Sequence, residues 1–503
     1  MTNPRATTPV LIVGAGPVGM TLASELARYQ VPLRIIDKTP QRTDKSKALV
    51  VWSRTLELFD RGSGAKRFID AGFKAHAVNF VAGDKTIGHV AMDDVESPYN
   101  FALMLPQSET ERVLEERLSE LGVAIERQVE LTGFTMRADG GDAVLRHPEG
   151  REEQVAVDWL IGCDGAHSAV RHGLQAPFTG VTMGADFMLA DVHMQGYPFP
   201  DTEIAIYWHR EGILVVFPIS PGRYRVIADL PPNGGEHPAT PTLDEVQAIL
   251  DRRGPPNLRA SDPVWLSGFR INGRKVSDYR HGRAFLLGDA AHVHSPAGGQ
   301  GMNTGMQDAF NLAWKLAMVV RGVVSGPAGD KLLDSVSPER SAVGEQVLKA
   351  ADRITEIGTL HNPVAQTLRN VAAHLALGLA PVQHAVIDRM TEIAIAYPHS
   401  PLNGPHGASG GPRPGERVSP APGQPPIGAG DTPRFTLFAE PTDAARDLTR
   451  RFATIIEPEI RPPLAKSGLW LARPDAYLAC SAKDAQAIAA YLDNLTRDER
   501  SSH

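Results

Sequence analysis

A glycine-rich turn between a short apolar run and an expected helix constrains the fold of this chain more than any other feature. Residues 14–19 read Gly-Ala-Gly-Pro-Val-Gly, directly after the apolar run Val10–Val13. We expect a helix over Pro17–Tyr29 and a second strand over Leu33–Ile36, which ends just before Asp37. Glycines so placed make a tight turn, let a pyrophosphate approach the helix N-terminus and allow the helix to pack on the strand. The sequence therefore predicts that the chain opens with a Rossmann-type βαβ unit.

The same motif supplies the first candidate binding residues. Gly14, Gly16, Pro17 and Gly19 would surround the phosphates of a dinucleotide. The carboxylate of Asp37 would accept hydrogen bonds from ribose hydroxyls. A glycine-rich turn without a ligand is the alternative, but both the spacing and the strand-turn-helix context fit a dinucleotide. The motif does not distinguish the adenosine of NAD from that of FAD.

The composition narrows the class of protein. The 503 residues include 51 basic and 58 acidic side chains, a net charge of −7, so no basic field is available to hold nucleic acid. The two cysteines, Cys163 and Cys480, are too few for a disulfide framework or a four-cysteine zinc site, and no metal site is expected. A run of about eighteen apolar residues and a signal-peptide pattern are both missing. We therefore expect a cytoplasmic protein that has no membrane spans.

Alternation between α/β and β-rich sequence predicts several domains. Nine prolines and eight glycines among residues 401–433 exclude regular structure there and indicate a linker. The predicted division is a first dinucleotide-binding part over 1–178 with a β excursion near 73–103, an inserted β-sheet domain over 179–272, a second dinucleotide-binding part over 273–400, the linker over 401–433, and a small α/β domain over 434–503. Within the first part we expect a surface helix over Glu109–Leu121 and a hairpin turn at Gly140-Gly141.

Two further glycine-containing segments carry candidate chemistry. Residues 283–292 read Arg-Ala-Phe-Leu-Leu-Gly-Asp-Ala-Ala-His, and a glycine-rich stretch then leads into a long expected helix. A carboxylate such as Asp289 at the tip of a buried strand suits a polyhydroxyl chain; the alternative is that Asp289 caps the next segment. Residues 159–171 read Trp-Leu-Ile-Gly-Cys-Asp-Gly-Ala-His-Ser-Ala-Val-Arg, which alone indicates a strand, an Asp-Gly turn and a helix start.

In this order and at these separations, the three motifs resemble the single-component FAD-dependent aromatic hydroxylases typified by para-hydroxybenzoate hydroxylase and phenol hydroxylase. The resemblance covers roughly residues 8–400. It implies an α/β fold in which a Rossmann-like FAD-binding domain holds an inserted β-sheet substrate domain. Residues 397–401, 414–417 and 473–477 resemble the small C-terminal thioredoxin-like α/β domain of the phenol and polyketide hydroxylase branch. That domain has no Cys-x-x-Cys here, so its expected role is structural or in subunit contact.

The resemblance also assigns roles to motif residues. It implies that Asp289 meets the ribityl chain of FAD and that the backbone at Met302 and Asn303 faces the isoalloxazine ring. The helix that begins at about Gly301 would direct its positive end toward that ring. Asp164 and Arg171 lie in the segment that such enzymes use near the junction of FAD and the nicotinamide cofactor.

Lys47 and Gln107 are two further FAD contacts that the resemblance implies. The family usually has arginine where this chain has Lys47, so its contact with the pyrophosphate would be a point charge rather than a fork. Gln107, just ahead of the helix expected at Glu109, matches a glutamine that contacts FAD in relatives. A solvated surface side chain is the alternative for each.

In such enzymes NADPH or NADH reduces FAD, the reduced flavin reacts with O₂, and a flavin C4a-hydroperoxide gives one oxygen atom to a phenolic ring. The resemblance thus implies a monooxygenase that hydroxylates a phenolic or polycyclic aromatic substrate, with a homodimer as one expected assembly. The nearest alternatives use the same cofactor chemistry for Baeyer–Villiger-type or drug-modifying oxygenation. An NAD-dependent dehydrogenase would leave Asp289 without a task, and a non-catalytic flavoprotein scaffold would not need all three motifs.

The wall of the substrate pocket is expected in the β-rich block. Val215, Phe217 and Ile219 share one face of an expected strand because alternate residues point the same way. This apolar face favours a large phenol or a polycyclic polyketide over a small carboxylate. Tyr207 and His209 are candidates for assisting phenol deprotonation, with a packing or surface role as the alternative. The candidate pocket residues are Tyr207, His209, Val215, Phe217, Ile219 and Pro296.

Overall fold

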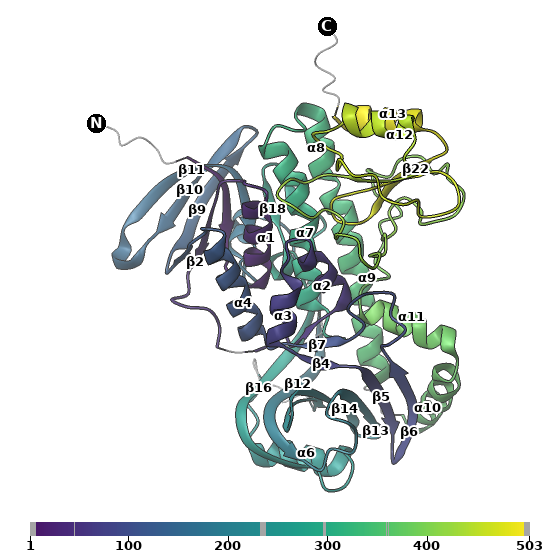
Figure 1. Ribbon diagram of the computed structural model, residues 1–503. Helices are drawn as coiled ribbons and strands as arrows, with labels where there is room; N and C mark the ends of the chain where they lie inside the picture. The colour runs from purple at the N-terminus through teal and green to yellow at the C-terminus, as the bar shows by residue number, and fades with distance from the viewer. Residues whose placement is uncertain are drawn as a thin grey trace.

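The computed structural model describes residues 7–44, 46–231, 238–294, 298–358, 360 and 362–496 (Figure 1). Pro296, one of the candidate pocket residues, lies outside the described residues. Among the residues described, none of the helices is by itself long and apolar enough to cross a membrane. One bent helix pair, Val364–Leu377 with Ala380–Met390, meets that test only when its two helices are taken together.

The first sheet is built around near-continuous apolar strands, as expected for parallel strands covered on both faces. Strand β1 (Thr7–Val13) pairs in parallel with β11 (Glu152–Gly162) on one side and with β2 (Leu33–Asp37) on the other. The strand order is β17-β18-β11-β1-β2-β8, with β10 paired to β11 and β9 to β10. The remaining strands are β8 (Ile125–Arg127), β9 (Glu130–Arg137), β10 (Gly140–Arg146), β17 (Arg280–His281) and β18 (Ala284–Leu286).

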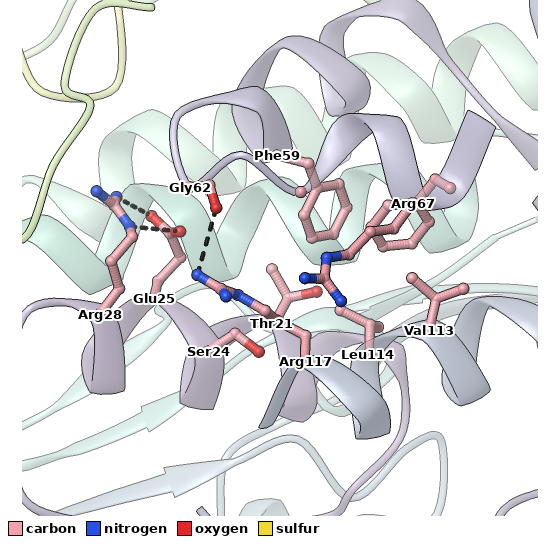
Figure 2. A pocket seen from close by; sticks show the side chains of 12 residues that line it. Thr21, Ser24, Glu25, Arg28, Phe59, Gly62, Arg67, Val113, Leu114 and Arg117 are labelled. Carbon is pink, nitrogen blue, oxygen red and sulfur yellow. Dashed lines mark hydrogen bonds and ion pairs between the residues drawn. The ribbon is translucent and has the colours of Figure 1, made fainter. Parts of the chain in front are cut away.

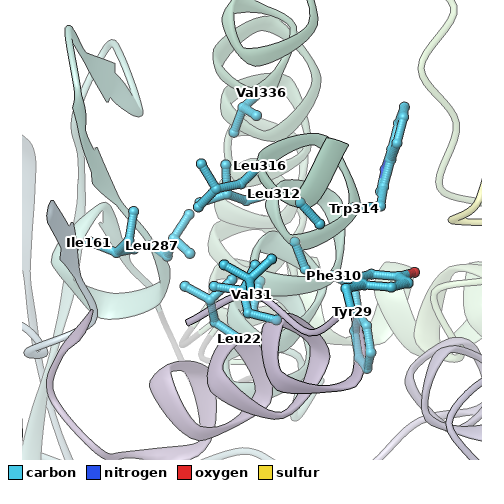
Figure 3. Packing of buried hydrophobic residues seen from close by; sticks show 14 of the residues in the cluster. Leu22, Tyr29, Val31, Ile161, Leu287, Phe310, Leu312, Trp314, Leu316 and Val336 are labelled. Carbon is cyan, nitrogen blue, oxygen red and sulfur yellow. The ribbon is translucent and has the colours of Figure 1, made fainter. Parts of the chain in front are cut away.

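Helices α1 (Pro17–Arg28) and α7 (Gly301–Val320) pack together beside this sheet. A proline opens α1, where the missing N–H costs no hydrogen bond. Figure 3 shows Leu22 of α1 facing the α7 residues Phe310 and Leu312 in the buried cluster. The other helices before residue 400 are α2 (Ser53–Asp60), α3 (Ala65–Ala71), α4 (Gln107–Glu120), η1 (Pro148–Gly150), α5 (Ala169–Gly173), α6 (Leu243–Arg253), η2 (Gly288–Ala290), α8 (Gly326–Asp334), α9 (Val336–Gly358), α10 (Pro363–Leu377) and α11 (Ala380–Met390).

The second sheet, at the bottom of Figure 1, contains the β-rich part of the chain. Its order is β19-β16-β12-β15-β14-β13-β5-β6. The strands are β5 (Ala77–Ala82), β6 (Lys85–Ala91), β12 (Thr179–Gln195), β13 (Glu203–His209), β14 (Gly212–Ser220), β15 (Arg223–Leu230), β16 (Arg259–Lys275) and β19 (His292–Val293). One face packs on α6, and the other lies against a small sheet of β3 (Val50–Val51), β7 (Ala102–Met104) and β4 (Phe73–Ala75). The excursion near 73–103 therefore contributes β5 and β6 to the second sheet.

The hairpin turn predicted at Gly140-Gly141 lies two residues earlier, so that prediction is wrong in position. Ala138 and Asp139 make the turn, and Gly140 already pairs with Arg137. The two glycines serve close packing instead, because a Cβ on Gly141 would lie 2.4 Å from the sulfur of Met136. A glycine pair marks both turns and tight strand contacts, and the sequence alone does not separate them.

The C-terminal residues form a small antiparallel sheet with two helices: β20 (Thr436–Phe438), β21 (Leu469–Ala472), β22 (Leu478–Ala482), α12 (Asp443–Arg451) and α13 (Ala485–Thr496). Residues 401–433 contain no regular helix or strand, as their composition predicts. Isolated bridges nevertheless join Arg417 to Tyr477 and His406 to Ser481. The segment is thus packed on the C-terminal sheet. The thioredoxin-like assignment and the exact domain boundaries stay predictions.

Candidate functional site

The three glycine-containing motifs meet at the carboxyl ends of the neighbouring parallel strands β1, β11 and β18. A Cβ placed on Gly14 would lie 2.4 Å from the carbonyl oxygen of Cys163, so the first motif touches the segment over 159–171. A Cβ placed on Gly288 would lie 2.7 Å from Cγ2 of Val18, so the segment over 283–292 touches the start of α1. Open α/β sheets bind ligands at these carboxyl ends. The convergence defines the candidate site.

Within the first turn the glycines serve two different purposes. Gly14 has a φ of +102°, and its N–H donates to the carbonyl of Ile36 at 2.9 Å. A Cβ on Gly19 would lie 1.9 Å from the Gly14 carbonyl oxygen, so only glycine lets α1 pack there. A Cβ on Gly16 would meet no atom of the described residues within 4 Å. Gly16 therefore leaves open space at the N-terminus of α1, where a phosphate can approach the backbone.

Asp37, at the end of β2, is held beside this turn. Its Oδ2 accepts the N–H of Ala15 at 2.7 Å. Its Oδ1 accepts the N–H of Thr39 at 2.8 Å and the hydroxyl of the same residue at 2.6 Å. The Asp37 side chain keeps 15% of its surface exposed. The carboxylate is therefore fixed and still accessible, as a contact with ribose hydroxyls requires.

Asp289, in η2, is accessible to solvent although protein surrounds it on several sides. Desolvation by that surrounding protein raises the pKa of its carboxyl, while His292 and Lys47 act in the opposite direction. A carboxylate in such surroundings suits the hydroxyl groups of a bound polyol chain. The open Gly16 backbone, the accessible Asp37 and this carboxylate together fit the diphosphate, ribose and ribityl groups of FAD.

Gln107 begins α4 and is bonded to the loop that carries Lys47. Its N–H donates to the hydroxyl of Ser46 at 2.8 Å, and its Oε1 accepts the N–H of Ala48 at 3.3 Å. Its Nε2 donates to Glu111 at 2.9 Å. Gln107 therefore fixes the residues on either side of the exposed Lys47. A direct contact of either residue with FAD stays a prediction.

At the start of α7, the side chain of Asn303 has a structural task. It is fully buried, its Oδ1 accepts the N–H of Trp52 at 2.9 Å, and its Nδ2 donates to the carbonyl of Val50 at 2.8 Å. These bonds tie α7 to β3. Gly301 and Met302 are only half-buried, so their backbone remains available to a ring at the helix N-terminus.

Asp164 and Arg171 are both engaged inside the protein. Ser168 is the N-cap of α5, and the Oδ2 of Asp164 accepts the N–H of Ala169 in the first turn at 2.7 Å. Arg171 is 3% exposed and donates to the carbonyls of Ala290 at 3.0 Å and Ala166 at 2.7 Å, and burial lowers its pKa. Arg171 thus joins the segment over 159–171 to η2. The contact expected between these residues and the nicotinamide cofactor stays a prediction.

Val215 and Phe217 lie half-buried on the face of β14 that points toward the small sheet, and Ile219 joins the same cluster. The structure therefore brings these three apolar candidates together, as the strand period predicts. They contact a cluster that includes Trp52 of the β3–α2 junction and Met104 of β7. Trp52 of the same cluster donates its backbone N–H to Asn303 of α7, so this cluster reaches the start of that helix.

Tyr207 and His209 are not brought to that wall. Tyr207 is 3% exposed and packs in the opposite cluster, under α6, and burial raises the pKa of its phenol. His209 ends β13, and its Nδ1 accepts the N–H of Glu211 at 3.2 Å. Burial lowers the pKa of His209. The sequence does not tell which face of β13 looks toward the wall. Of the two roles considered for Tyr207, the structure shows the packing role.

A buried polar network behind α7 was not found from the sequence. Asp308 of α7 bonds His292 through Nε2 at 2.8 Å and Arg340 of α9 through Nε at 2.6 Å. Arg340 also donates to the Tyr397 hydroxyl at 2.9 Å. The residues that bond each other in this network are 16 to 57 positions apart in the sequence, so no local motif predicts the network. The network fixes α7 relative to the strand end that carries Asp289.

A second buried acid lies beside the same helix. Glu392 is 1% exposed and accepts hydrogen bonds from Thr304 at 3.0 Å and from Gln307. Burial is the main cause that raises the pKa of Glu392 from 4.5 to about 8, while the two hydrogen bonds act in the opposite direction. At neutral pH the folded protein therefore favours the protonated acid.

We expect Glu392→Gln to remove a pH dependence of stability. Because the folded protein binds this proton more tightly than the unfolded chain, the contribution is present below pH 4.5 and is lost as the pH rises through 8. Between pH 5 and 9 the free energy of unfolding of the wild type should therefore fall relative to that of the variant, on the order of a few kcal/mol. Urea denaturation at several pH values measures this, with the exposed Glu152→Gln as control. Parallel pH profiles for wild type and Glu392→Gln would contradict it.

A small pocket elsewhere is not the candidate site. Figure 2 shows it lined by Ser24 of α1, by Phe59 and Arg67, and by Leu114 and Arg117 of α4. Its volume of about 20 Å³ holds one or two water molecules. None of the candidate residues lines it. In the described part of the chain, no three His, Cys, Asp or Glu side chains are grouped so as to hold a metal ion.

Comparison with known proteins agrees with this site. A family model described as an FAD binding domain matches residues 7–351. The 6-methylpretetramide 4-monooxygenase of Streptomyces rimosus is 38% identical over 430 residues, which cover 83% of this chain and 75% of that protein. The pentachlorophenol 4-monooxygenase of Sphingobium chlorophenolicum is 32% identical over 473 residues, covering 90% of this chain and 85% of that protein.

A solved structure shares nearly the whole fold. The anhydrotetracycline hydroxylase OxyS of Streptomyces rimosus superposes with a TM-score of 0.78 at 26% identity. The match covers 97% of this chain and 99% of that one, so it includes the C-terminal residues. These three relatives are named as monooxygenases or hydroxylases, and none of the names favours the dehydrogenase or scaffold alternatives.

Proposed function

Since this chain belongs to the FAD-binding-domain family of flavin-dependent monooxygenases, we propose that it hydroxylates a large, mostly apolar phenolic or polycyclic aromatic compound. The observation that carries the proposal is the apolar wall of Val215, Phe217 and Ile219. Arg225, directly opposite Phe217, is buried and paired with Asp191, so its charge is not available to a small carboxylate. The names of the relatives, which include a pretetramide and an anhydrotetracycline enzyme, support a polycyclic substrate.

The chain's own residues would serve the reaction by binding and orienting. FAD, when bound, supplies hydride acceptance from NADPH or NADH and the activation of O₂. The backbone at Gly16 would hold its diphosphate, Asp37 its ribose and Asp289 its ribityl hydroxyls. The N-terminus of α7 near Gly301 would stabilise negative charge on the reduced ring. The apolar wall would exclude water from the aromatic substrate.

Oxygen uptake by the FAD-loaded protein tests this proposal. We expect one member of a panel of phenols and polycyclic polyketides to stimulate oxygen consumption with NADPH or NADH and to gain a single oxygen atom with little peroxide. Comparing oxygen uptake with NADPH and with NADH also shows which of the two coenzymes the enzyme uses as its reductant. If no compound stimulates uptake above the basal rate, or if the product carries a ring-inserted oxygen, the hydroxylation proposal is wrong.

Two matched variants test whether the substrate contacts the apolar wall. Phe217→Ala should raise the KM for the stimulating compound about tenfold or more and divert oxygen to peroxide, because an aromatic contact and water exclusion are lost. Tyr207→Phe, altered on the opposite face of the same sheet, should leave both quantities within about twofold. The measurement is the ratio of product to NAD(P)H consumed. Equal effects of the two variants would place the substrate elsewhere.

The homodimer and the cytoplasmic location expected from the sequence stay predictions. Light scattering of the purified protein at several concentrations tests the first.

A further inference from the structure

Two arginine–aspartate pairs of the second sheet are almost completely buried. Arg225 of β15 and Asp191 of β12 are each 1% exposed, with Nε–Oδ1 and Nη2–Oδ2 distances of 2.7 and 2.9 Å. Arg253 of α6 and Asp229 of β15 are 5% and 8% exposed, at 2.7 Å. A buried pair is often no more stabilising than apolar side chains of similar volume. The other hydrogen bonds that each arginine makes are therefore a better guide to its role.

The two arginines hold different parts of the molecule. Lys47 lies in the loop between β2 and β3. The Nη1 of Arg225 donates to the carbonyl oxygen of Lys47 at 3.2 Å. Arg253 donates to the carbonyls of Ile213 in β14 at 3.0 Å and of Glu211 in the β13–β14 turn at 2.8 Å. Arg225 thus reaches from one part of the chain to another, whereas Arg253 closes its own sheet.

The loop that Arg225 holds carries Lys47, for which a contact with FAD is predicted. Lys47 is exposed, and its charge is close enough to Asp289 to oppose the rise in the pKa of that carboxyl. The same loop is fixed on its other side by Gln107, through Ser46 and Ala48. The position of the Lys47 ammonium therefore depends on one bond from the second sheet and on a set of bonds from α4.

Arg225 also stands in the row that forms the substrate wall. Across the sheet, Phe217 lies directly opposite Arg225, Arg225 opposite Asp191, and Asp191 opposite Trp265. Residues directly opposite in antiparallel strands share a face. The Arg225 guanidinium carbon lies 5.7 Å from the centre of the Trp265 ring. A charged pair therefore interrupts the apolar face at the point where it meets the loop of Lys47.

We propose that Arg225, oriented by Asp191, is a positioning residue that holds the Lys47 loop over the FAD site and fastens that loop to the wall carrying Phe217. The assignment of the wall and the place of the Lys47 loop beside FAD both rest on the proposed function, but the effect on FAD can be measured without a substrate. The substrate wall and one side of the FAD site then move as one unit. Loss of the bond releases the loop, so FAD binds more weakly even when no substrate is present.

Arg225→Lys tests this, with Arg253→Lys as the matched control. A lysine at 225 can keep its charge beside Asp191, but its single ammonium cannot reproduce the fork and also reach the Lys47 carbonyl. We expect the FAD Kd, measured by flavin fluorescence titration of the apoprotein, to rise at least tenfold in Arg225→Lys and less than twofold in Arg253→Lys. The thermal unfolding of both apoproteins should fall by a similar amount, because both lose a buried fork.

The outcome is decided by the ratio of the two Kd values. A ratio of five or more supports the proposal, and a smaller ratio overturns it. If Arg225→Lys does not fold, the double variants Asp191→Leu with Arg225→Met and Asp229→Leu with Arg253→Met replace the single ones, since both remove the charged pair entirely. The titration uses FAD alone, so a failure to find a hydroxylated substrate leaves this result unaffected.

Discussion

Replacing Gly16 by alanine should abolish tight FAD binding and leave the apoprotein folded. The added Cβ meets no described protein atom within 4 Å, so the folded chain accommodates it. It does, however, occupy the space through which a diphosphate reaches the N–H groups at the start of α1. Losing two hydrogen bonds to a charged phosphate costs about 3 kcal/mol or more, which is about a hundredfold or more in Kd. Gly16 precedes α1 as its N-cap, where alanine costs about 1 kcal/mol or less in stability.

Gly14→Ala is the matched control, because alanine at this position should destabilise the folded apoprotein instead of blocking the diphosphate. At a φ of +102° and with a Cβ 2.4 Å from the carbonyl oxygen of Cys163, alanine strains the apoprotein itself. We expect the free energy of unfolding to fall by about 2–4 kcal/mol. Urea denaturation and FAD titration of both variants separate the two effects. Normal FAD affinity in a folded Gly16→Ala protein would show that the diphosphate does not pass this turn.

Arg473→Met should be the most destabilising single substitution in the C-terminal part. Arg473 is fully buried and donates to Glu339 of α9 at 2.6 and 3.0 Å and to Asp475 at 3.0 and 2.6 Å. Lys315 of α7 also bonds Glu339, at 2.6 Å. Removing the arginine leaves two carboxylates in the core with one remaining cation. Breaking a buried pair in this way costs about 3–5 kcal/mol.

The exposed pair between Arg451 and Asp493 provides the control. Their side chains are 57% and 37% exposed, at 2.7 Å, so Arg451→Met should cost about 1 kcal/mol or less. Chemical denaturation followed by tryptophan fluorescence is a direct readout, because Trp314 donates to Asp475 at 3.0 Å. A loss below about 1 kcal/mol in Arg473→Met would mean that the network relaxes around the missing charge.

Local patterns predicted the parts of the site that a few adjacent residues build. The turn at Gly14–Gly19, the acid at the end of β2 and Asp289 at the end of β18 each follow from one strand and what comes after it. The period of a strand also predicted that Val215 and Phe217 share a face. It could not say which face of the neighbouring strand carries the same wall, so Tyr207 stayed a pocket candidate although it packs on the opposite face.

What the sequence missed depends on contacts between distant segments. Asp308 meets Arg340 across 32 positions, and Arg225 meets Lys47 across 178. Neither pair has a spacing that any helix or strand would impose. The segment over 401–433 shows the same limit, because its composition excludes regular structure but does not reveal that Arg417 bonds the buried Glu57 at 2.7 Å.

Helix α7 begins at the candidate flavin site, and near its other end Lys315 is neutralised by an acid that Arg473 also binds. This arrangement bears on how such a chain can evolve. A descendant that lost the C-terminal residues would leave Lys315, Glu339 and Trp314 uncovered before any replacement had arisen. Loss of these residues would therefore need compensating changes around Lys315 and Glu339. The buried charges thus couple the stability of α7 to the C-terminal residues, whether or not those residues take part in catalysis.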